Sequence, residues 1–309
     1  MNQASMSSFS DSLAHPLIVI VGATASGKTR LAVELAQLLG GEILSADSRQ
    51  IYRGLDLGSG KDLAEYGHIR YHLIDIADLG EPYQVCRYQQ DFWQAYNQVV
   101  ARGALPILCG GSGLYLDAIL NGYQFADVAP NPELRQQWAN DPLSDMAAQL
   151  QQLNPLLWAS TDLSVRSRVE RALEISLAGH NEQRSAYPKP QALVLGIHWP
   201  REQLRQRIAE RLQQRLDAGL IEEVAALREL HGDASLEALG LEYRYSCRYL
   251  RGELDDAQLF SQLATAIGQF AKRQETWLRR MQRHGTTIHS LDGQQPLLPQ
   301  ALAVLESSR

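Results

Sequence analysis

The 309-residue sequence contains only three cysteines, Cys86, Cys109 and Cys247. So few scattered thiols exclude a disulfide framework or a zinc cage and are typical of a reducing compartment. No apolar run approaches the roughly 20 residues needed to span a bilayer, so we expect no membrane-embedded segment. The first fifteen residues lack the basic and apolar regions of a signal peptide and predict a disordered polar tail. We therefore expect a cytoplasmic protein.

An excess of positive charge is also missing. The chain carries 29 Lys and Arg against 35 Asp and Glu, a net charge of −6, which argues against a general nucleic-acid binder. Basic residues nevertheless gather between Ala264 and His284, where five of them accompany one acid, Glu275. We therefore expect a local basic surface on an acidic protein.

Apolar segments that alternate with helical patterns predict an α/β protein with a parallel, doubly wound sheet. Most of the apolar segments are rich in β-branched residues and continuous, as strands buried on both faces are. Phe92–Arg102 predicts one of the intervening helices. The predicted strands are Leu17–Val21, Glu42–Ala46, His72–Ile76, Leu105–Cys109 and Leu193–Ile197.

Residues 123–190 differ from the rest of the chain. They are rich in Gln, Leu, Ala and Asn, show helical periodicity and contain no convincing strand. Prolines at both edges indicate hinges. We predict a helical insertion domain over 123–190, within a core made of 16–122 and 191–309.

After Pro200 the chain is predicted to be mostly helical. Leu204, Ile208, Leu212 and Leu216 form an apolar stripe at i, i+4 spacing. Arginines repeat at the same spacing on a second stripe, which predicts a solvated face. These arginines are Arg207, Arg211 and Arg215.

A phosphate-binding loop follows the first predicted strand and precedes a predicted helix. The segment matches the pattern Gly-x-x-x-x-Gly-Lys-Thr in full. Glycines let backbone N–H groups curl inward toward phosphate oxygens, and the helix N-terminus adds a favourable dipole. We expect a diphosphate or triphosphate to bind here. The loop consists of Gly22, Ala23, Thr24, Ala25, Ser26, Gly27, Lys28 and Thr29.

The phosphate loop alone leaves hydrolysis, kinase chemistry and displacement of pyrophosphate open. Walker-type hydrolases carry an Asp at the end of an apolar strand to hold the metal. The strand Leu105–Cys109 ends in Gly-Gly-Ser-Gly instead, and Asp75 is the only similar candidate. The pattern of a nucleotide hydrolase is therefore incomplete.

Asp47 follows the second predicted strand, which places it at the carboxyl edge of a parallel sheet, beside the phosphate site. A carboxylate near bound phosphates needs a reason, because like charges repel. It could ligate a metal, accept a proton from a nucleophile, or simply cap a helix.

Six segments that follow one another between about Leu17 and Leu291 together resemble the tRNA dimethylallyltransferase family. The resemblance implies a P-loop NTPase-like core with a helical insertion that contacts tRNA. It also implies transfer of a dimethylallyl group from dimethylallyl diphosphate to N6 of adenosine 37 in the tRNA anticodon loop, with release of pyrophosphate. The segments are Gly22–Thr29, Ser45–Gly54, His72–Ile76, Gly110–Tyr115, Arg168–Glu174 and Ala271–Arg279.

The resemblance also implies roles for single residues. The phosphate loop would bind the diphosphate, with Mg²⁺ near Thr29; Asp47 would accept the proton from the amine. Ser112 would hydrogen-bond the ester oxygen as the C–O bond lengthens. A monomer is expected. The residues implied to contact tRNA are Asp47, Ser48, Arg49, Gln50, Arg168, Arg171, Arg273 and Gln274.

The sequence departs from the family pattern at several positions. Gly268 stands where the family usually has an Arg that is expected to help clamp the diphosphate, and Arg244 or Arg248 could replace that cation. The Gly240–Arg244 segment is also altered. Trp277 could be a core residue or could stack on a base. Two alternative functions follow: prenyl transfer to a free adenine nucleotide, and an ATP-binding P-loop kinase or non-catalytic paralogue.

Overall fold

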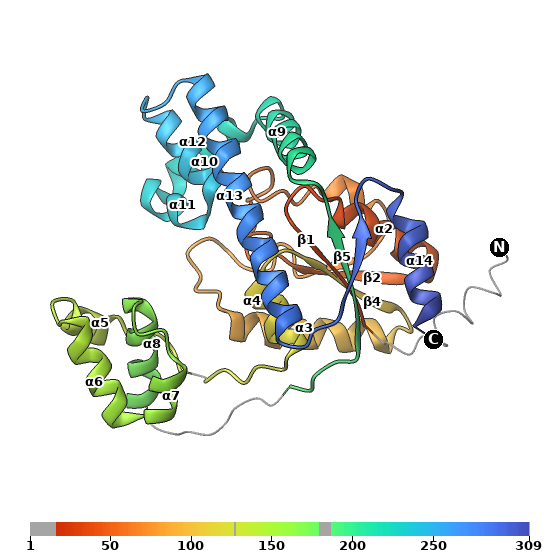
Figure 1. Ribbon diagram of the computed structural model, residues 1–309. Coiled ribbons are helices and arrows are strands. Elements are labelled where there is room, and N and C mark those ends of the chain that lie inside the picture. The colour runs from red at the N-terminus through yellow and green to blue at the C-terminus, as the bar shows by residue number, and fades with distance from the viewer. Residues whose placement is uncertain (1–16, 127, 179–186, 309) are drawn as a thin grey trace. The chain divides into compact units, whose positions relative to one another are not determined.

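A six-stranded, all-parallel sheet forms the centre of the computed structural model, which describes residues 17–126, 128–178 and 187–308 (Figure 1). The strand order is β3-β2-β4-β1-β5-β6. The predicted α/β class with a parallel sheet is confirmed, whereas the predicted tail, residues 1–15, lies outside the described residues. The strands are β1 (Leu17–Gly22), β2 (Gly41–Ala46), β3 (Tyr71–His72), β4 (Leu105–Gly110), β5 (Ala192–His198) and β6 (Ile288–Asp292).

Two strands differ from the prediction. The expected strand His72–Ile76 is wrong, because only Tyr71–His72 pairs with β2. Leu73 and Asp75 have φ angles of 65° and 56°, so the chain turns out of the strand. The sixth strand, β6, was not predicted, because its sequence Ile-His-Ser-Leu-Asp resembles a polar segment and lies at the sheet edge.

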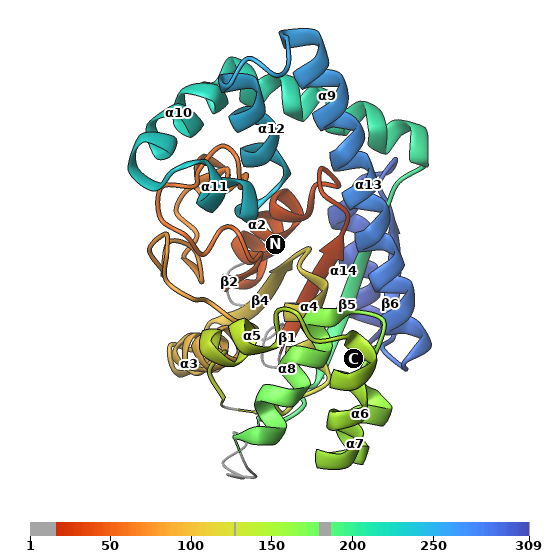
Figure 2. The same cartoon turned by 90° about the vertical axis from the view of Figure 1, so that its left-hand side faces the viewer.

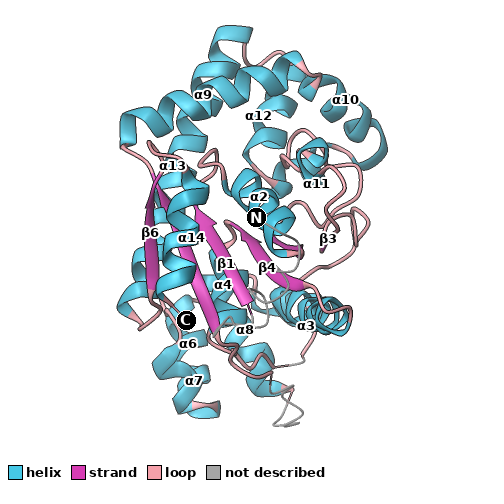
Figure 3. Cartoon of the chain, turned by 90° about the vertical axis from the view of Figure 1, so that its right-hand side faces the viewer, coloured by secondary structure: helices cyan, strands magenta, loops and turns pink. Residues whose placement is uncertain are grey.

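Helices cover both faces of the sheet (Figure 3). Helices α2 (Lys28–Leu39) and α14 (Leu297–Ser307) share a buried apolar cluster with Ile18, Ile20 and Ile107 of the sheet. On the other face lie α3 (Val85–Ala101) and α4 (Gly113–Leu120), which contact each other. Side chains alternate along each strand, so a fully buried β1 needs a cover on both sides.

Four helices and the first part of the long α13 gather beyond the carboxyl ends of the strands, as Figures 1 and 2 show. The rest of α13 runs back alongside the sheet and contacts α4. Two apolar clusters hold the gathered helices together: one joins α9 to α13 through Leu204, Ile208 and Leu263, and the other joins α10, α11 and α12. A capping box of Asp255 and Gln258 starts the long α13. The helices are α9 (Arg201–Asp217), α10 (Leu220–His231), α11 (Asp233–Leu239), α12 (Leu241–Leu250) and α13 (Asp256–Arg283).

Tyr123–Tyr187 forms a second compact unit, separate from the unit that contains the sheet. Its core is built from Trp138, Met146, Leu150 and Leu173. None of the described helices is long and apolar enough to cross a membrane. The helices of this unit are α5 (Pro132–Trp138), α6 (Leu143–Leu153), α7 (Pro155–Ser160) and α8 (Arg166–Leu177).

Candidate functional site

The phosphate loop joins the end of β1 to the start of α2 and is tightly curled. Ala25 and Gly27 have φ angles of 60° and 92°, in the left-handed region. A Cβ at Gly22 would lie 2.8 Å from the Ser26 hydroxyl, so the turn leaves no room for a side chain there. The Lys28 ammonium donates a hydrogen bond to the Ala23 carbonyl, 2.7 Å away. The first N–H groups of α2 have no intrahelical partner and are available to an anion.

Lys28 carries its charge in a poorly solvated place. Burial of the ammonium is the main cause that lowers its pKa to about 8. The neighbouring Cys109 thiol stays neutral, because burial raises its pKa to about 12. An anion placed against Lys28 would restore the solvation that the ammonium lacks, so the loop favours a phosphate ligand.

Lys28 and Asp47 line the same narrow cavity, which has a volume of about 60 Å³. We call it the Lys28–Asp47 cavity. It shares Lys28, Thr29, Arg211 and Arg215 with an adjoining pocket of about 480 Å³, the phosphate-loop pocket. Of the predicted site residues, Thr24, Lys28, Thr29, Asp47, Arg49, Gln50 and Gln274 line the cavity, whereas Ala25, Ser26 and Gly27 line the pocket.

Asp47 is placed by the turn that follows β2. Its Oδ1 accepts a hydrogen bond of 3.0 Å from the Arg49 backbone N–H, which orients the carboxylate. Its other oxygen, Oδ2, accepts no hydrogen bond from the described residues. This half-buried carboxylate therefore keeps one oxygen free to accept a proton.

Ser112 ties the loops after β2 and β4 together. Its hydroxyl accepts a 2.9 Å hydrogen bond from the Ser48 backbone N–H, and its own N–H donates to the Ala46 carbonyl at 3.0 Å. A Cβ at Gly110 would lie 2.3 Å from the Ala46 oxygen, so glycine permits this close approach. Ser48 is exposed, and Ser112 is half-buried beside it.

Gln274 joins the phosphate loop to the loop after β4. Its Oε1 accepts a 2.8 Å hydrogen bond from the Thr24 N–H, and its Nε2 donates to the Gly111 carbonyl at 3.0 Å. The neighbouring Arg273 is exposed. Trp277, for which core packing and base stacking were both open, packs closely on α4, where a Cβ at Gly113 would lie 2.4 Å from its ring.

Arg49 and Gln50 make contacts within the protein. The buried Gln50 amide accepts from the Ser45 hydroxyl at 2.8 Å and donates to the Gly60 carbonyl at 3.0 Å. Arg49 donates to the Leu239 carbonyl at 3.0 Å. Both side chains therefore shape the wall of the Lys28–Asp47 cavity.

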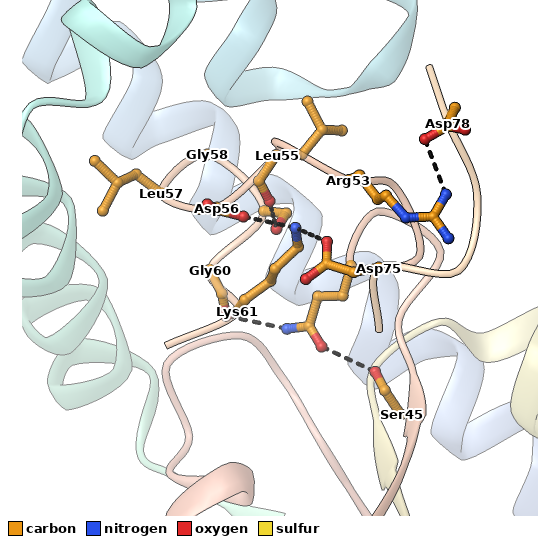
Figure 4. A network of polar contacts seen from close by, with 12 residues as sticks. Ser45, Arg53, Leu55, Asp56, Leu57, Gly58, Gly60, Lys61, Asp75 and Asp78 are labelled. Atoms are coloured by element: carbon orange, nitrogen blue, oxygen red, sulfur yellow. Dashed lines mark hydrogen bonds and ion pairs between the residues drawn. The ribbon is translucent and has the colours of Figure 1, made fainter. Parts of the chain in front are cut away.

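Lys61 organises the loop behind this wall and was not among the predicted site residues. Its side chain is 1% exposed, and its ammonium lies 2.7 Å from Asp56 and 2.5 Å from Asp75 (Figure 4). Asp75, the only residue that resembled a Walker-type acid, is thus held in an ion pair. The network fixes the loop that receives the Gln50 amide.

The arginine stripe of α9 is not a solvated face, and that prediction is wrong. Arg207 donates to the Ala25 carbonyl at 2.9 Å and lies 4.3 Å from the centre of the Trp199 ring. Arg211 and Arg215 line the Lys28–Asp47 cavity and the phosphate-loop pocket. Helix α9 follows β5, which neighbours β1 in the sheet, so this stripe reaches the phosphate loop.

Comparison with known proteins finds two matching family models and close relatives of this chain. The model of the IPP transferase family matches residues 50–281, and an isopentenyl transferase model matches residues 15–76. The chain is 53% identical over 283 residues to tRNA dimethylallyltransferase 2 of Trichlorobacter lovleyi, covering 90% of this chain and 92% of that protein. It is 48% identical over 295 residues to tRNA dimethylallyltransferase 1 of Geotalea uraniireducens, covering 94% and 96%. The chain belongs to the tRNA dimethylallyltransferase family.

Solved structures agree with this family. The tRNA isopentenylpyrophosphate transferase of Bacillus halodurans superposes with a TM-score of 0.68 at 28% identity, covering 94% of this chain and 97% of that one. The corresponding enzyme of Staphylococcus epidermidis has a TM-score of 0.67, also at 28% identity, with the same two coverages. Both likenesses extend over nearly the whole chain.

The arginine that the family resemblance led us to expect is absent at Gly268, which lines a different groove of about 890 Å³. Arg244 and Arg248, the two cations suggested as its replacement, do not line the Lys28–Asp47 cavity. Arg244 donates to the Glu237 carbonyl at 3.2 Å, and Arg248 lies 3.2 Å from Glu253. Arg211 and Arg215 of α9 do line the cavity, together with Lys28 and Arg49.

The remaining predicted residues of this family member lie on α8, in the second unit. Arg168 is exposed and pairs with Asp162 at 2.8 Å. Arg171 pairs with Glu174 at 3.0 Å and also donates to the Val128 carbonyl.

Thr29 is the residue predicted to be near a metal ion. Among the residues that the structure describes, no three His, Cys, Asp or Glu side chains cluster as a metal site would require. The Thr29 side chain lies on the first turn of α2 and lines both the Lys28–Asp47 cavity and the phosphate-loop pocket. Mg²⁺ commonly binds through one or two protein oxygens together with substrate phosphates and water, and the donor set here fits that mode.

Proposed function

We propose that this protein transfers a dimethylallyl group from dimethylallyl diphosphate to N6 of adenosine 37 in the anticodon loop of tRNA, releasing pyrophosphate. One observation carries the proposal: Lys28 of the phosphate loop and the Asp47 carboxylate, which has a free oxygen, line one cavity. The names of the relatives, tRNA dimethylallyltransferases, support the same reaction.

The donor's diphosphate binds at the phosphate loop, in the phosphate-loop pocket. The N–H groups at the start of α2 and the Lys28 ammonium contact its oxygens. The Thr29 hydroxyl would hold Mg²⁺ together with the diphosphate, and the ion would neutralise part of the leaving group's charge. The allylic carbon then points into the narrower Lys28–Asp47 cavity.

The transfer is a displacement at that carbon. The N6 amine of the adenine forms a C–N bond while the C–O bond to the diphosphate breaks, and pyrophosphate leaves with the bonding electrons. Asp47 takes the proton that the amine loses. Ser112, beside the Asp47 turn, donates a hydrogen bond toward the ester oxygen as negative charge grows there.

The RNA must present the adenine outside its stack, because N6 cannot otherwise reach the donor carbon. The exposed side chains of Ser48 and Arg273 contact the RNA near the site. Arg168 and Arg171 contact it from the second unit. Arg49, Gln50 and Gln274 act on the RNA indirectly, because they shape the wall of the Lys28–Asp47 cavity.

The direct test is to incubate the protein with labelled dimethylallyl diphosphate and total unmodified tRNA. Label should appear in RNA carrying adenosine 37. Parallel reactions with AMP, ADP and ATP separate transfer to free nucleotides, and calorimetry with ATP against dimethylallyl diphosphate separates an ATP-binding protein. No transfer to any tRNA, under conditions where a related enzyme works, would contradict the proposal.

Asp47→Asn should lower kcat by roughly 10²–10⁴-fold, the usual contribution of a general base. The KM for the donor should change little, because the carboxylate acts on the amine and not on the diphosphate. Asp78→Asn, which alters an exposed carboxylate in another loop, is the matched control. A normal kcat in Asp47→Asn would remove this residue from the proton transfer.

A further inference from the structure

Arg211 and Arg215 of α9 line the phosphate-loop pocket together with Lys28. Arg215 is not used by the reaction described above. The side chain of Arg215 is only 11% exposed. Its Nε is buried and has no hydrogen-bond partner among the described residues. A buried, charged donor without an acceptor is costly, so its presence in a hollow indicates that an acceptor from outside the protein belongs there.

The carboxylates near these arginines compensate them incompletely. Glu242 is 3.8 Å from the Arg215 guanidinium and 3.7 Å from that of Arg49, longer than a charge-assisted hydrogen bond. Its Oε2 is buried and also lacks a hydrogen bond. Arg211 pairs with Asp62 at the rim. Burial, and after it the Arg211 charge, lower the pKa of Arg215, as expected for cations crowded together.

Gly60 makes room for the two guanidinium groups. Its φ angle is +66°, and a Cβ there would lie 1.7 Å from the Nη2 of Arg215 and 3.1 Å from that of Arg211. Any side chain at this position would therefore displace Arg215. The loop that carries Gly60 is itself held by the Lys61 network of Figure 4, so the arginines enter a preformed recess.

We propose that Arg215 adds a cation to the diphosphate site of the phosphate loop, and that Glu242 holds Arg215 until the diphosphate replaces it. The ligand class is inorganic pyrophosphate or an organic diphosphate; its identity as the prenyl donor rests on the proposed function. A planar guanidinium presents a fork of donors that matches phosphate oxygens. Arg215 therefore binds the donor and also the leaving group, whose charge increases as the C–O bond breaks.

The test measures pyrophosphate binding by calorimetry, using the full chain in Mg²⁺ buffer without RNA. Arg215→Gln should weaken binding roughly tenfold to a hundredfold, the loss expected for one charged hydrogen-bonding partner. Arg205→Gln is the matched control, because Arg205 lies on the same helix, is exposed and lines neither the cavity nor the phosphate-loop pocket. Unchanged affinity in Arg215→Gln would overturn the inference.

Glu242→Gln sharpens the test, since its expected effect has the opposite sign. Removing the carboxylate that competes for Arg215 should tighten pyrophosphate binding by roughly threefold or more. A merely structural role for the pair would make both variants bind more weakly, and that result contradicts the inference. If Arg215→Gln does not fold, as thermal unfolding would show, Glu242→Gln carries the same test.

The outcome is independent of the transfer reaction. A protein that binds pyrophosphate through Arg215 but prenylates no tRNA would keep this inference and contradict the proposed function. Normal prenyl transfer together with unchanged pyrophosphate binding in Arg215→Gln would contradict the inference alone.

Discussion

Two groups of cations in the sheet-containing unit are neutralised in different ways. Among α10, α11 and α12, Arg251 lies 2.6 Å from each of three carboxylates, Asp233, Glu237 and Glu253. We call this the outer ion-pair cluster. Around the phosphate loop, the Arg215 guanidinium comes no closer than 3.8 Å to the carboxylate of Glu242. The outer cluster is saturated and partly solvent-accessible. In the inner group, Arg215 is only 11% exposed and is incompletely paired.

This difference in pairing distinguishes charges that stabilise the fold from charges that are completed by a bound ligand. Exposed ion pairs add little stability individually, but they satisfy their own charges. Buried cations that lack full partners reduce stability, and a protein retains them where a ligand supplies the missing negative charge. The inner group, Lys28 with Arg211 and Arg215, is therefore expected to respond to mutation in function, and the outer group in stability.

Among the variants that compare the two groups of charges, Lys28→Met should have the largest effect on pyrophosphate binding. Pyrophosphate binding should fall roughly a hundredfold, because the loop loses its charged donor. Thermal stability should not fall, since a poorly solvated cation has been removed next to two others. Calorimetry and thermal unfolding on the same preparation check both parts. A marked loss of stability without a loss of binding would place Lys28 among the structural charges.

The pH dependence of donor binding should reflect the lowered pKa of Lys28. The free enzyme holds the ammonium form below its pKa of about 8 and loses it above that pH. Donor kcat/KM should therefore be level below about pH 8 and then fall by up to roughly tenfold per pH unit. Lys28→Arg should remove this decline, because a guanidinium stays charged throughout the range. A wild-type profile that stays level to pH 10 would contradict the role of the ammonium.

Arg251→Gln should give the smallest effect and only in stability. The outer ion-pair cluster loses its central cation, so the midpoint of thermal unfolding should fall by at most a few degrees. Pyrophosphate affinity and prenyl transfer should be unchanged. If pyrophosphate binding weakened as much as in Arg215→Gln, the separation between the two groups of charges would not hold.

Local chemistry made some elements predictable. The phosphate loop was recognised because Gly22 and Gly27 lie at fixed offsets from Lys28, and the loop's shape depends on those few residues. The strand β1 was found because its side chains are apolar on both faces. The strand β6 was missed because an edge strand needs no such continuous pattern. Asp75 was misplaced because the chain turns at Leu73 and Asp75, where Asp75 pairs with Lys61.

The arginines of α9 show where local patterns stop being informative. Their i, i+4 spacing establishes that they share one helix face, but the same spacing is typical of a solvated surface. Likewise, the sequence does not indicate that Glu242 lies beside Arg49, or that Arg215 packs against Gly60, about 150 positions away. Such contacts depend on how distant segments pack.

The amino-acid order alone was sufficient for the fold class, the tight glycine-containing turn after β1 and the family to which the chain belongs, because each depends on short segments with their own physical preferences. The folded arrangement was needed to show that the phosphate loop and Asp47 line one cavity and that α9 supplies the opposing cations. The physical reason is that the exposure of a helix face, and the solvation of each charge on it, are set by whatever packs against that face.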